Sequence, residues 1–342
     1  MDRWDYRSAA DIERVIEDCR QAGFSSVMFQ VRGNGTVLYP SAFEIWSEGF
    51  EHSDPGFDPL AVAIQAAHSR GLELHAWVNL MPGWRGSEPP EDRRQLWHVR
   101  REWFLEERLG SASDYVNINP CLPEVRRHLA DLCGEIASRY DIDGVHLDYV
   151  RFPDPTANAT QETGLDHLTR MLFSRATGRP TSDHDALRRW QADCVTELVR
   201  EVRQRVRGAK PEIPLTAAVI ASPSVARTKV KQDWTTWCRF GLIDAVFPMN
   251  YTGDDARFEA QAQEALEAAY SVPVIMGVGI YKLGSGEQAR HQMDEAIALG
   301  AAGVAVFSYR TMFGHGPEVD PLVRAGLRRD VRQWMDASAR RR

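Results

Sequence analysis

One strand-like segment places a carboxylate and an imidazole on the same face. In the run Asp143–Pro153, a period of two puts Gly144, His146 and Asp148 on one side. Parallel strands that are buried on both faces are almost wholly apolar, so two polar side chains on one face indicate a site. A carboxylate at the end of such a strand can act as a nucleophile or as a general acid or base, and we predict that Asp148 is essential for catalysis. The alternative is a structural ion pair between Asp148 and a basic neighbour such as Arg151.

Other predicted strand ends carry amides, basic groups and aromatic rings. Sugar hydroxyls need side chains that donate and accept hydrogen bonds, and the C–H faces of a sugar stack on aromatic rings. Amides, basic groups and aromatic rings that converge on one carboxylate therefore favour a carbohydrate substrate. The residues predicted to bind it are Arg32, His75, Trp77, Asn79, His146, Tyr149, Arg151, Asn250, Tyr251 and Tyr309.

Repeated strand-helix units must position these residues. Short apolar, β-branched runs alternate with amphipathic helical patterns, which is typical of an α/β fold with a parallel sheet. The predicted strands are Ser25–Arg32, Leu72–Asn79, Gly144–Arg151, Leu215–Ile220, Ala245–Asn250, Val274–Ile280 and Val304–Tyr309. The helical patterns include Ala10–Ala22, Pro59–Ser69, Pro123–Tyr140, Asp185–Arg207 and Gly286–Leu299.

Seven strands are one fewer than a closed (β/α)8 barrel needs. The chain opens on Trp4–Arg7 directly before a helix, and we interpret this segment as the last turn of a truncated or incomplete first strand. A few upstream residues in the natural protein would complete that strand. We expect a single (β/α)8 barrel domain over residues 1–342, with long loops after strands three and four at about 80–122 and 154–214. Loops at that end of a barrel form the walls of the active site.

Composition excludes several classes of protein. The chain has 342 residues with 41 basic and 48 acidic side chains, a net charge of −7 and no long basic run, so nucleic-acid binding is not expected. The five cysteines lie far apart without a C-x-x-C pair, which indicates neither a zinc site nor a disulfide framework. We expect no metal and no cofactor. No apolar stretch approaches the roughly 18 residues that cross a bilayer, so we expect no membrane span.

Several sequence motifs, in their order and spacing along the chain, resemble those of the glycosyl hydrolase-like 10 family, formerly called domain of unknown function 187. The resemblance extends from about Trp4 to Arg310 and rests on Phe29–Gly35, Leu38–Ser41, Asp54–Leu60, Leu74–Asn79, Asp143–Pro153, Gln232–Trp234 and Pro248–Thr252. It implies a TIM-barrel glycoside hydrolase, usually bacterial and often exported or lipid-anchored, which would place the protein at the cell envelope. Some members of the family are linked to peptidoglycan glycan strands, particularly strands without their peptides.

The catalytic residues of two larger groups of TIM-barrel enzymes, the α-amylase-type enzymes and the chitinases, are only partly present in this sequence. Asp143–Asp148 is similar to the nucleophile strand of α-amylase-type enzymes, but His146 stands at their usual arginine and Leu215–Ile220 offers no acid. Chitinases place a catalytic glutamate two residues after the last aspartate of this strand, and Val150 occupies that position here. Their Met-x-Tyr motif on the sixth strand does resemble Met249–Tyr251.

Glycoside hydrolysis usually needs a second carboxyl group. Asp5 and Asp254 are the first candidates for this second carboxyl group. Each lies close to a predicted strand end, and groups near strands are held more rigidly than groups on loops. The other candidates are Glu44, Glu48, Glu88 and Asp255. Because no second acid is obvious, a carbohydrate-binding barrel without catalysis is the alternative function. A lyase or metal-assisted hydrolase is a weaker alternative, since no His, Asp and Glu set has metal-ligand spacing.

Overall fold

The protein contains a curled, parallel sheet surrounded by helices. The computed structural model describes residues 2–105, 115–154, 166–314 and 320–339. Seven strands form the sheet in the order β1-β2-β5-β6-β7-β8-β9, and every neighbouring pair is parallel. These strands are β1 (Ser26–Arg32), β2 (Glu73–Asn79), β5 (Gly144–Asp148), β6 (Leu215–Ile220), β7 (Ala245–Asn250), β8 (Ile275–Gly279) and β9 (Gly303–Phe307).

All seven predicted strands are confirmed, with small differences at their ends. The strand predicted over Gly144–Arg151 ends at Asp148, and the one predicted over Val304–Tyr309 ends at Phe307. At Tyr149 the backbone has a φ of 50°, which turns the chain out of the extended conformation directly after Asp148. The carboxylate therefore stands at the last position of its strand.

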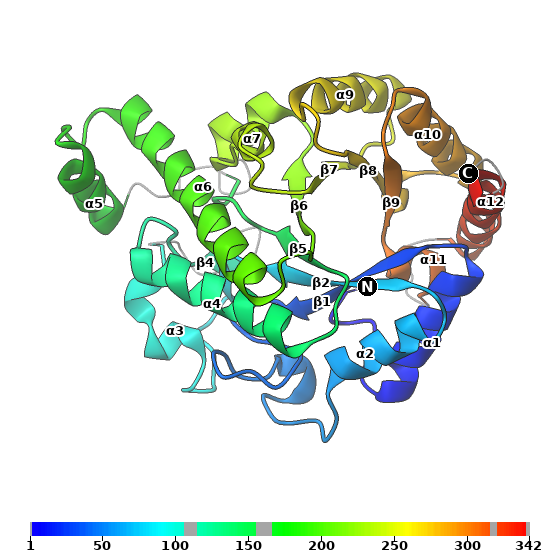
Figure 1. Cartoon of the computed structure of the whole chain (residues 1–342), viewed down its shortest axis with the longest axis horizontal. Helices are drawn as coiled ribbons and strands as arrows, with labels where there is room; N and C mark the ends of the chain where they lie inside the picture. The colour runs from blue at the N-terminus through cyan, green and yellow to red at the C-terminus, as the bar shows by residue number, and fades with distance from the viewer. Residues whose placement is uncertain (1, 106–114, 155–165, 315–319, 340–342) are drawn as a thin grey trace.

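Helices cover the outer face of the sheet (Figure 1). The five predicted helices correspond to α1 (Ala9–Gln21), α2 (Pro59–His68), α4 (Pro123–Arg139), α6 (His184–Ala209) and α10 (Gly286–Ala298). The further helices are α3 (Leu96–Val99), α5 (His167–Thr177), α7 (Pro223–Val230), α8 (Trp234–Arg239), α9 (Asp255–Ala268), α11 (Tyr309–Phe313) and α12 (Pro321–Ala339).

The sequence of α1 shows why these helices form where they do. The Ser8 side chain accepts from the backbone of Asp11, and the Asp11 carboxylate accepts in return from the backbone of Ser8, which makes a capping box. Ile12, Val15 and Ile16 recur at helical spacing and are fully buried. Each buried side chain of this size contributes about 1.5–3 kcal/mol, so this face fixes α1 against the sheet.

The sheet is an open barrel. Within the described residues β1 and β9 form its two edges. Residues 2–8 make turns and bends just before α1. On this side α12 packs against α10 and α11, and α11 contacts α1, so helices from both ends of the chain lie together (Figure 1).

The long connections add structure at the site end of the barrel. The connection after β2 contains a small antiparallel hairpin of β3 (Pro82–Arg85) and β4 (Tyr115–Asn117), and the connection after β5 contains α5 and α6. The loop predictions therefore hold in position, although both connections contain regular elements. No helix in the described ranges is long and apolar enough to cross a membrane.

Candidate functional site

A pocket of about 1980 Å³ occupies the inside of the sheet. Alternate residues of each strand face it: His75, Trp77 and Asn79 of β2, then His146 and Asp148 of β5. The residues between them, such as Leu74, Val78 and Leu147, are fully buried on the opposite, helix-covered face. This alternation gives a polar interior and an apolar exterior, and it directs the chemistry-bearing groups into one cavity.

Asp148 lies at the carboxyl end of β5 with only 7% of its surface exposed. The backbone N–H of Tyr149 donates to Asp148 Oδ1 at 2.6 Å, and Arg151 Nη1 lies 3.4 Å from the same oxygen. On the adjacent strand Asn79 occupies the matching position in the register. An N–H and a guanidinium on one oxygen fix the orientation of the carboxylate.

Three polar atoms on the inner face of β2 lack partners. His75 Nδ1, Trp77 Nε1 and Asn79 Oδ1 are buried, and none of them makes a hydrogen bond within the described part of the chain. Leaving a buried donor or acceptor unsatisfied costs about 1–3 kcal/mol, so a ligand that supplies partners recovers this free energy. One donor, the indole N–H of Trp77, and one acceptor, the amide oxygen of Asn79, suit a ligand rich in hydroxyl groups.

His146 lies beneath Asp148 on β5 and is neutral. Its Nδ1 is 2.8 Å from Thr216 Oγ1, and its ring meets Phe247 edge-on with centroids 4.7 Å apart. Burial, assisted by the neighbouring His75, lowers the pKa of His146 to about 3. A neutral imidazole keeps one N–H for hydrogen bonding and shapes the floor of the pocket, but it does not act as a general acid at neutral pH.

Aromatic rings form one wall of the pocket. Tyr251 stacks on Phe307 at 5.4 Å, and the edges of Trp77 and Tyr281 meet the same Phe307 ring at 6.5 and 6.1 Å. Burial raises the pKa of Tyr251 well above its ordinary value, and nearby Asp148 adds to the shift, so its hydroxyl stays protonated. Sequence reasoning missed Tyr281 and Phe307, although each lies at or next to the end of a predicted strand.

A row of contacts between arginines and tyrosine rings extends from the β3–β4 pair to Asp148. Arg85 lies over the ring of Tyr115 at 5.5 Å, Tyr115 contacts Tyr149 at 5.3 Å, and Arg151 lies over Tyr149 at 4.4 Å. All four line the pocket. Burial and Asp148 raise the pKa of Tyr149 to about 12. Nothing in the sequence indicated that Arg85 and Tyr115 face the pocket, apart from their position in a long loop.

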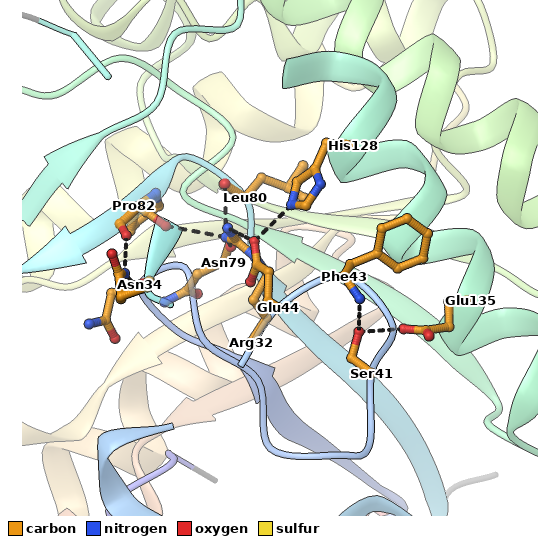
Figure 2. Close-up of polar contacts among 12 residues, drawn as sticks. Arg32, Asn34, Ser41, Phe43, Glu44, Asn79, Leu80, Pro82, His128 and Glu135 are labelled. Atoms are coloured by element: carbon orange, nitrogen blue, oxygen red, sulfur yellow. Dashed lines mark hydrogen bonds and ion pairs between the residues drawn. The ribbon is translucent and has the colours of Figure 1, made fainter. Parts of the chain in front are cut away.

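Arg32 lies outside the pocket lining and is fully buried (Figure 2). Its Nε and Nη2 donate to Glu44 at 2.9 and 2.7 Å, and its Nη1 donates to the carbonyls of Asn79, Leu80 and Pro82. His128 Nε2 lies 3.0 Å from Glu44 Oε1. Arg32 and His128 lower the pKa of Glu44 to about 2 despite its burial. Arg32 therefore holds the chain after β2 in place through its hydrogen bonds to three carbonyls, and Glu44 is its counter-ion.

A bulge explains the position of Arg32. Gln30 pairs with Trp77, but Arg32 pairs with Val78, because the register shifts between them. Trp77 faces the pocket whereas Val78 faces the helices, so the shift turns Arg32 to the outer face.

Asn250 also lies outside the pocket lining. It is fully buried, and its Nδ2 donates to the carbonyl of Phe258 in α9 at 2.8 Å. Met249, one residue earlier, faces the pocket instead. Tyr309 lines the pocket, but its hydroxyl donates to Asp18 of α1 at 2.7 Å.

The candidates for a second carboxylate occupy different settings. The side chain of Asp5 is 2% exposed, accepts from the backbone N–H of Asp2 at 2.7 Å and lies 3.6 Å from Arg310 Nε. Burial, the largest influence, raises the pKa of Asp5. Asp254 is exposed and caps α9 by accepting from the backbone of Arg257. None of the six predicted acids is among the residues that line the pocket; besides Asp5 and Asp254 these are Glu44, Glu48, Glu88 and Asp255.

A curled parallel sheet with helices on its outer face and polar groups at the carboxyl ends of its strands defines a protein of the TIM-barrel class. The chain belongs to the glycosyl hydrolase-like 10 family, which it matches over residues 1–296.

In the aligned regions, about a quarter of the residues are identical between the chain and its curated relatives. Glycosyl hydrolase YngK of Bacillus subtilis is 26% identical over 295 residues, and the alignment covers 79% of this chain and 55% of YngK. Glycosyl hydrolase DigH of Escherichia coli O6:H1 is 25% identical over 304 residues, and the alignment covers 79% of this chain and 65% of DigH. The chain thus spans between half and two thirds of the length of these relatives.

Solved structures share the fold at lower identity. The α-L-fucosidase isoenzyme 2 from Paenibacillus thiaminolyticus has a TM-score of 0.66 at 15% identity, over 96% of this chain and 46% of that one. The β-galactosidase from Marinomonas ef1 also has a TM-score of 0.66, at 12% identity, over 96% of this chain and 57% of that one. At these identities the likeness shows the fold.

Proposed function

We propose that this protein is a glycoside hydrolase that cleaves O-glycosidic bonds of a polysaccharide or oligosaccharide, with Asp148 as its essential carboxylate. The observation that carries the proposal is the setting of Asp148. It is buried at a strand end in a large pocket, with its Oδ1 bound by the Tyr149 N–H and by Arg151. The fold of the family places catalytic groups at this end of the strands.

The remaining lining residues suit the binding of a sugar. Trp77, Tyr251, Tyr281 and Phe307 offer faces and edges for the apolar side of a pyranose ring. Asn79 stands beside Asp148 and presents a buried amide oxygen that has no partner in the described ranges. These groups hold a glycosidic bond against the carboxylate.

Asp5 is our first assignment for the second carboxyl group. Its raised pKa favours the protonated form, which a general acid needs. Its partner Arg310 lines the pocket, as do Asp2, Arg3 and Trp4 from the same segment. Asp254 is the other predicted acid, but it is exposed and its carboxylate caps α9, so we place it second.

The substrate to test first is the glycan strand of peptidoglycan without its peptides, as the family resemblance implies. The same resemblance predicts an exported protein of the cell envelope.

The proposal is tested by mass spectrometry of products from a glycan panel that includes peptide-free peptidoglycan strands. We expect shorter oligosaccharides from the wild-type protein and at least about a thousandfold lower rate for Asp148→Asn, since loss of a group at the reacting centre commonly costs this much. Asp185→Asn is the matched control, because Asp185 is 79% exposed on the outer surface. Tight binding of glycans without any product over long incubation would instead support a carbohydrate-binding barrel.

A further inference from the structure

Arg3 is a buried arginine in the pocket wall that the sequence did not single out. Only 2% of its surface is exposed, and its backbone N–H donates to Gln30 Oε1 at 3.0 Å. The guanidinium lies against Gly33, where a Cβ would overlap its Nη1. The absence of a side chain at Gly33 therefore makes the space that the Arg3 guanidinium occupies.

The guanidinium of Arg3 is incompletely satisfied. Its Nε and Nη2 are buried and make no hydrogen bond with any residue that the structure describes. Glu48 forms a long ion pair with Nη2 at 3.7 Å, and its carboxylate accepts hydrogen bonds from Ser47 Oγ at 3.1 Å and Thr36 Oγ1 at 3.3 Å. The guanidinium also lies over the Trp4 ring, 5.0 Å from its centroid. Two buried donors without hydrogen-bond acceptors among the described residues are still costly, so the free energy falls when an oxyanion binds them.

The pocket lining has an excess of positive charge around the carboxyl ends of the strands. The arginines in the described lining are Arg3, Arg7, Arg85, Arg151 and Arg310. The acids in the same lining are Asp2, Glu73, Asp148 and Asp294. Glu73 opens β2 at its opposite end, and Asp294 accepts from Trp334 on α12. Three of these arginines also lie within ion-pair distance of one carboxylate each: Arg3 with Glu48, Arg151 with Asp148 and Arg310 with Asp5. Arginines still outnumber acids in the lining at this end, in a chain that carries −7 as a whole, and this local arrangement favours an anion.

Arg3 lines the same pocket as Asp148. Its backbone is bound to the side chain of Gln30 on β1, and Gln30 pairs in the register with Trp77 of β2. A group bound by Arg3 would therefore belong to a sugar in the pocket that contains Asp148.

We propose that the pocket takes an acidic glycan and that Arg3 binds an anionic oxygen group, a carboxylate, on one of its sugars. This inference rests on the proposed function and adds a substrate class to it. Two adjacent donors of a guanidinium match the two oxygens of a carboxylate, which makes the bond both strong and directional. Arg3 is then a specificity-determining residue, distinct from Asp148.

The test measures binding to the Asp148→Asn protein by calorimetry, so that turnover does not interfere. The probes are peptide-free peptidoglycan strands, oligogalacturonate and hyaluronan fragments, each paired with its carboxyl-reduced counterpart of the same length. A sulfated galactan fragment and its desulfated form test whether a sulfate ester replaces the carboxylate. We expect the acidic member of at least one pair to bind about tenfold or more tightly than its neutral counterpart, as a charge-assisted hydrogen bond provides.

Arg3→Gln should abolish this preference while leaving the neutral counterpart bound as before, and Arg3→Lys should keep part of it. Arg200→Gln, an equal loss of charge on the half-exposed surface of α6, should change neither. Thermal unfolding of each variant confirms that it is folded. Equal binding of acidic and neutral members, equal loss of both in Arg3→Gln, or no binding in any pair overturns the inference. An acidic preference without hydrolysis by the wild-type protein overturns the proposed function alone, and hydrolysis without the preference overturns this inference alone.

Discussion

Single side chains in this pocket divide into groups that bind a ligand and groups that hold the protein together. Asp148 and Asn79 stand side by side on neighbouring strands and both face the cavity. Arg32 and Asn250 come from equivalent strand ends but lie outside the pocket lining, where the Arg32 guanidinium and the Asn250 Nδ2 donate to protein carbonyls. The type of residue at a strand end is therefore not sufficient, because the face it occupies decides its role.

The pKa of Asp5 gives a prediction for the pH dependence of hydrolysis. Burial raises this pKa, so the folded protein binds the proton more tightly than an exposed aspartate does. If Asp5 is the proton donor, activity falls as the pH rises through its raised pKa, because the acid form is lost. A pH profile of kcat for Asp5→Asn should lack this alkaline limb and be strongly reduced throughout. An unchanged limb in the variant would assign the proton donor to another group.

The buried pair of Arg32 and Glu44 gives a prediction for stability (Figure 2). Glu44→Gln removes the counter-ion of a fully buried guanidinium, and such a loss commonly costs about 3–5 kcal/mol in the free energy of unfolding. Since the pKa of Glu44 is lowered to about 2, its stabilisation is complete above the ordinary pKa of glutamate and is lost as the pH falls towards 2. Urea unfolding between neutral and acid pH checks both points. A variant as stable as wild type at neutral pH would contradict them.

At the scale of elements, the β3–β4 pair brings a long loop into contact with the end of β5. Its Tyr115 lies between Arg85 and the pair of Tyr149 and Arg151, and Arg151 in turn contacts Asp148. This row of contacts predicts that Tyr115 positions Tyr149 and Arg151 beside the carboxylate.

Tyr115→Leu should lower kcat about three- to tenfold with a smaller change in KM. The substitution keeps an apolar side chain but loses an aromatic pair worth about 0.5–1.5 kcal/mol, which loosens Tyr149 and Arg151 beside Asp148. Tyr115→Phe keeps the ring and should retain near-normal kcat. Steady-state kinetics of the two variants provide the measurement, and equal losses in both would show that the ring is not the positioning group.

At the scale of the whole molecule, α12 closes the side where the sheet is open. It packs against α10 and α11, and its Leu327 and Val331 are fully buried (Figure 1). Its Trp334 and Met335 line the lower part of the pocket, where the edges of β1 and β9 lie. The helix therefore contributes to both the core and the boundary of the cavity.

Leu327→Ala should lower the free energy of unfolding by about 2–5 kcal/mol, because it leaves a cavity in a packed interface. Leu322→Ala on the same helix is the matched control, since Leu322 is 83% exposed and its loss should cost less than about 0.5 kcal/mol. Chemical denaturation of both variants checks the prediction. Equal stabilities would mean that α12 docks more loosely than its burial indicates.

The sequence by itself determined the strands, the main helices and the position of Asp148, because a period of two and a period of 3.6 are local properties of a chain. It also carried the family motifs. Only the tertiary structure decided which polar residues share the cavity. The bulge before Arg32 turned that side chain outward, and folding brought Arg3, Arg85 and Tyr115 to the pocket from segments without periodic patterns. Such placements depend on contacts between residues far apart in the chain, which no local pattern encodes.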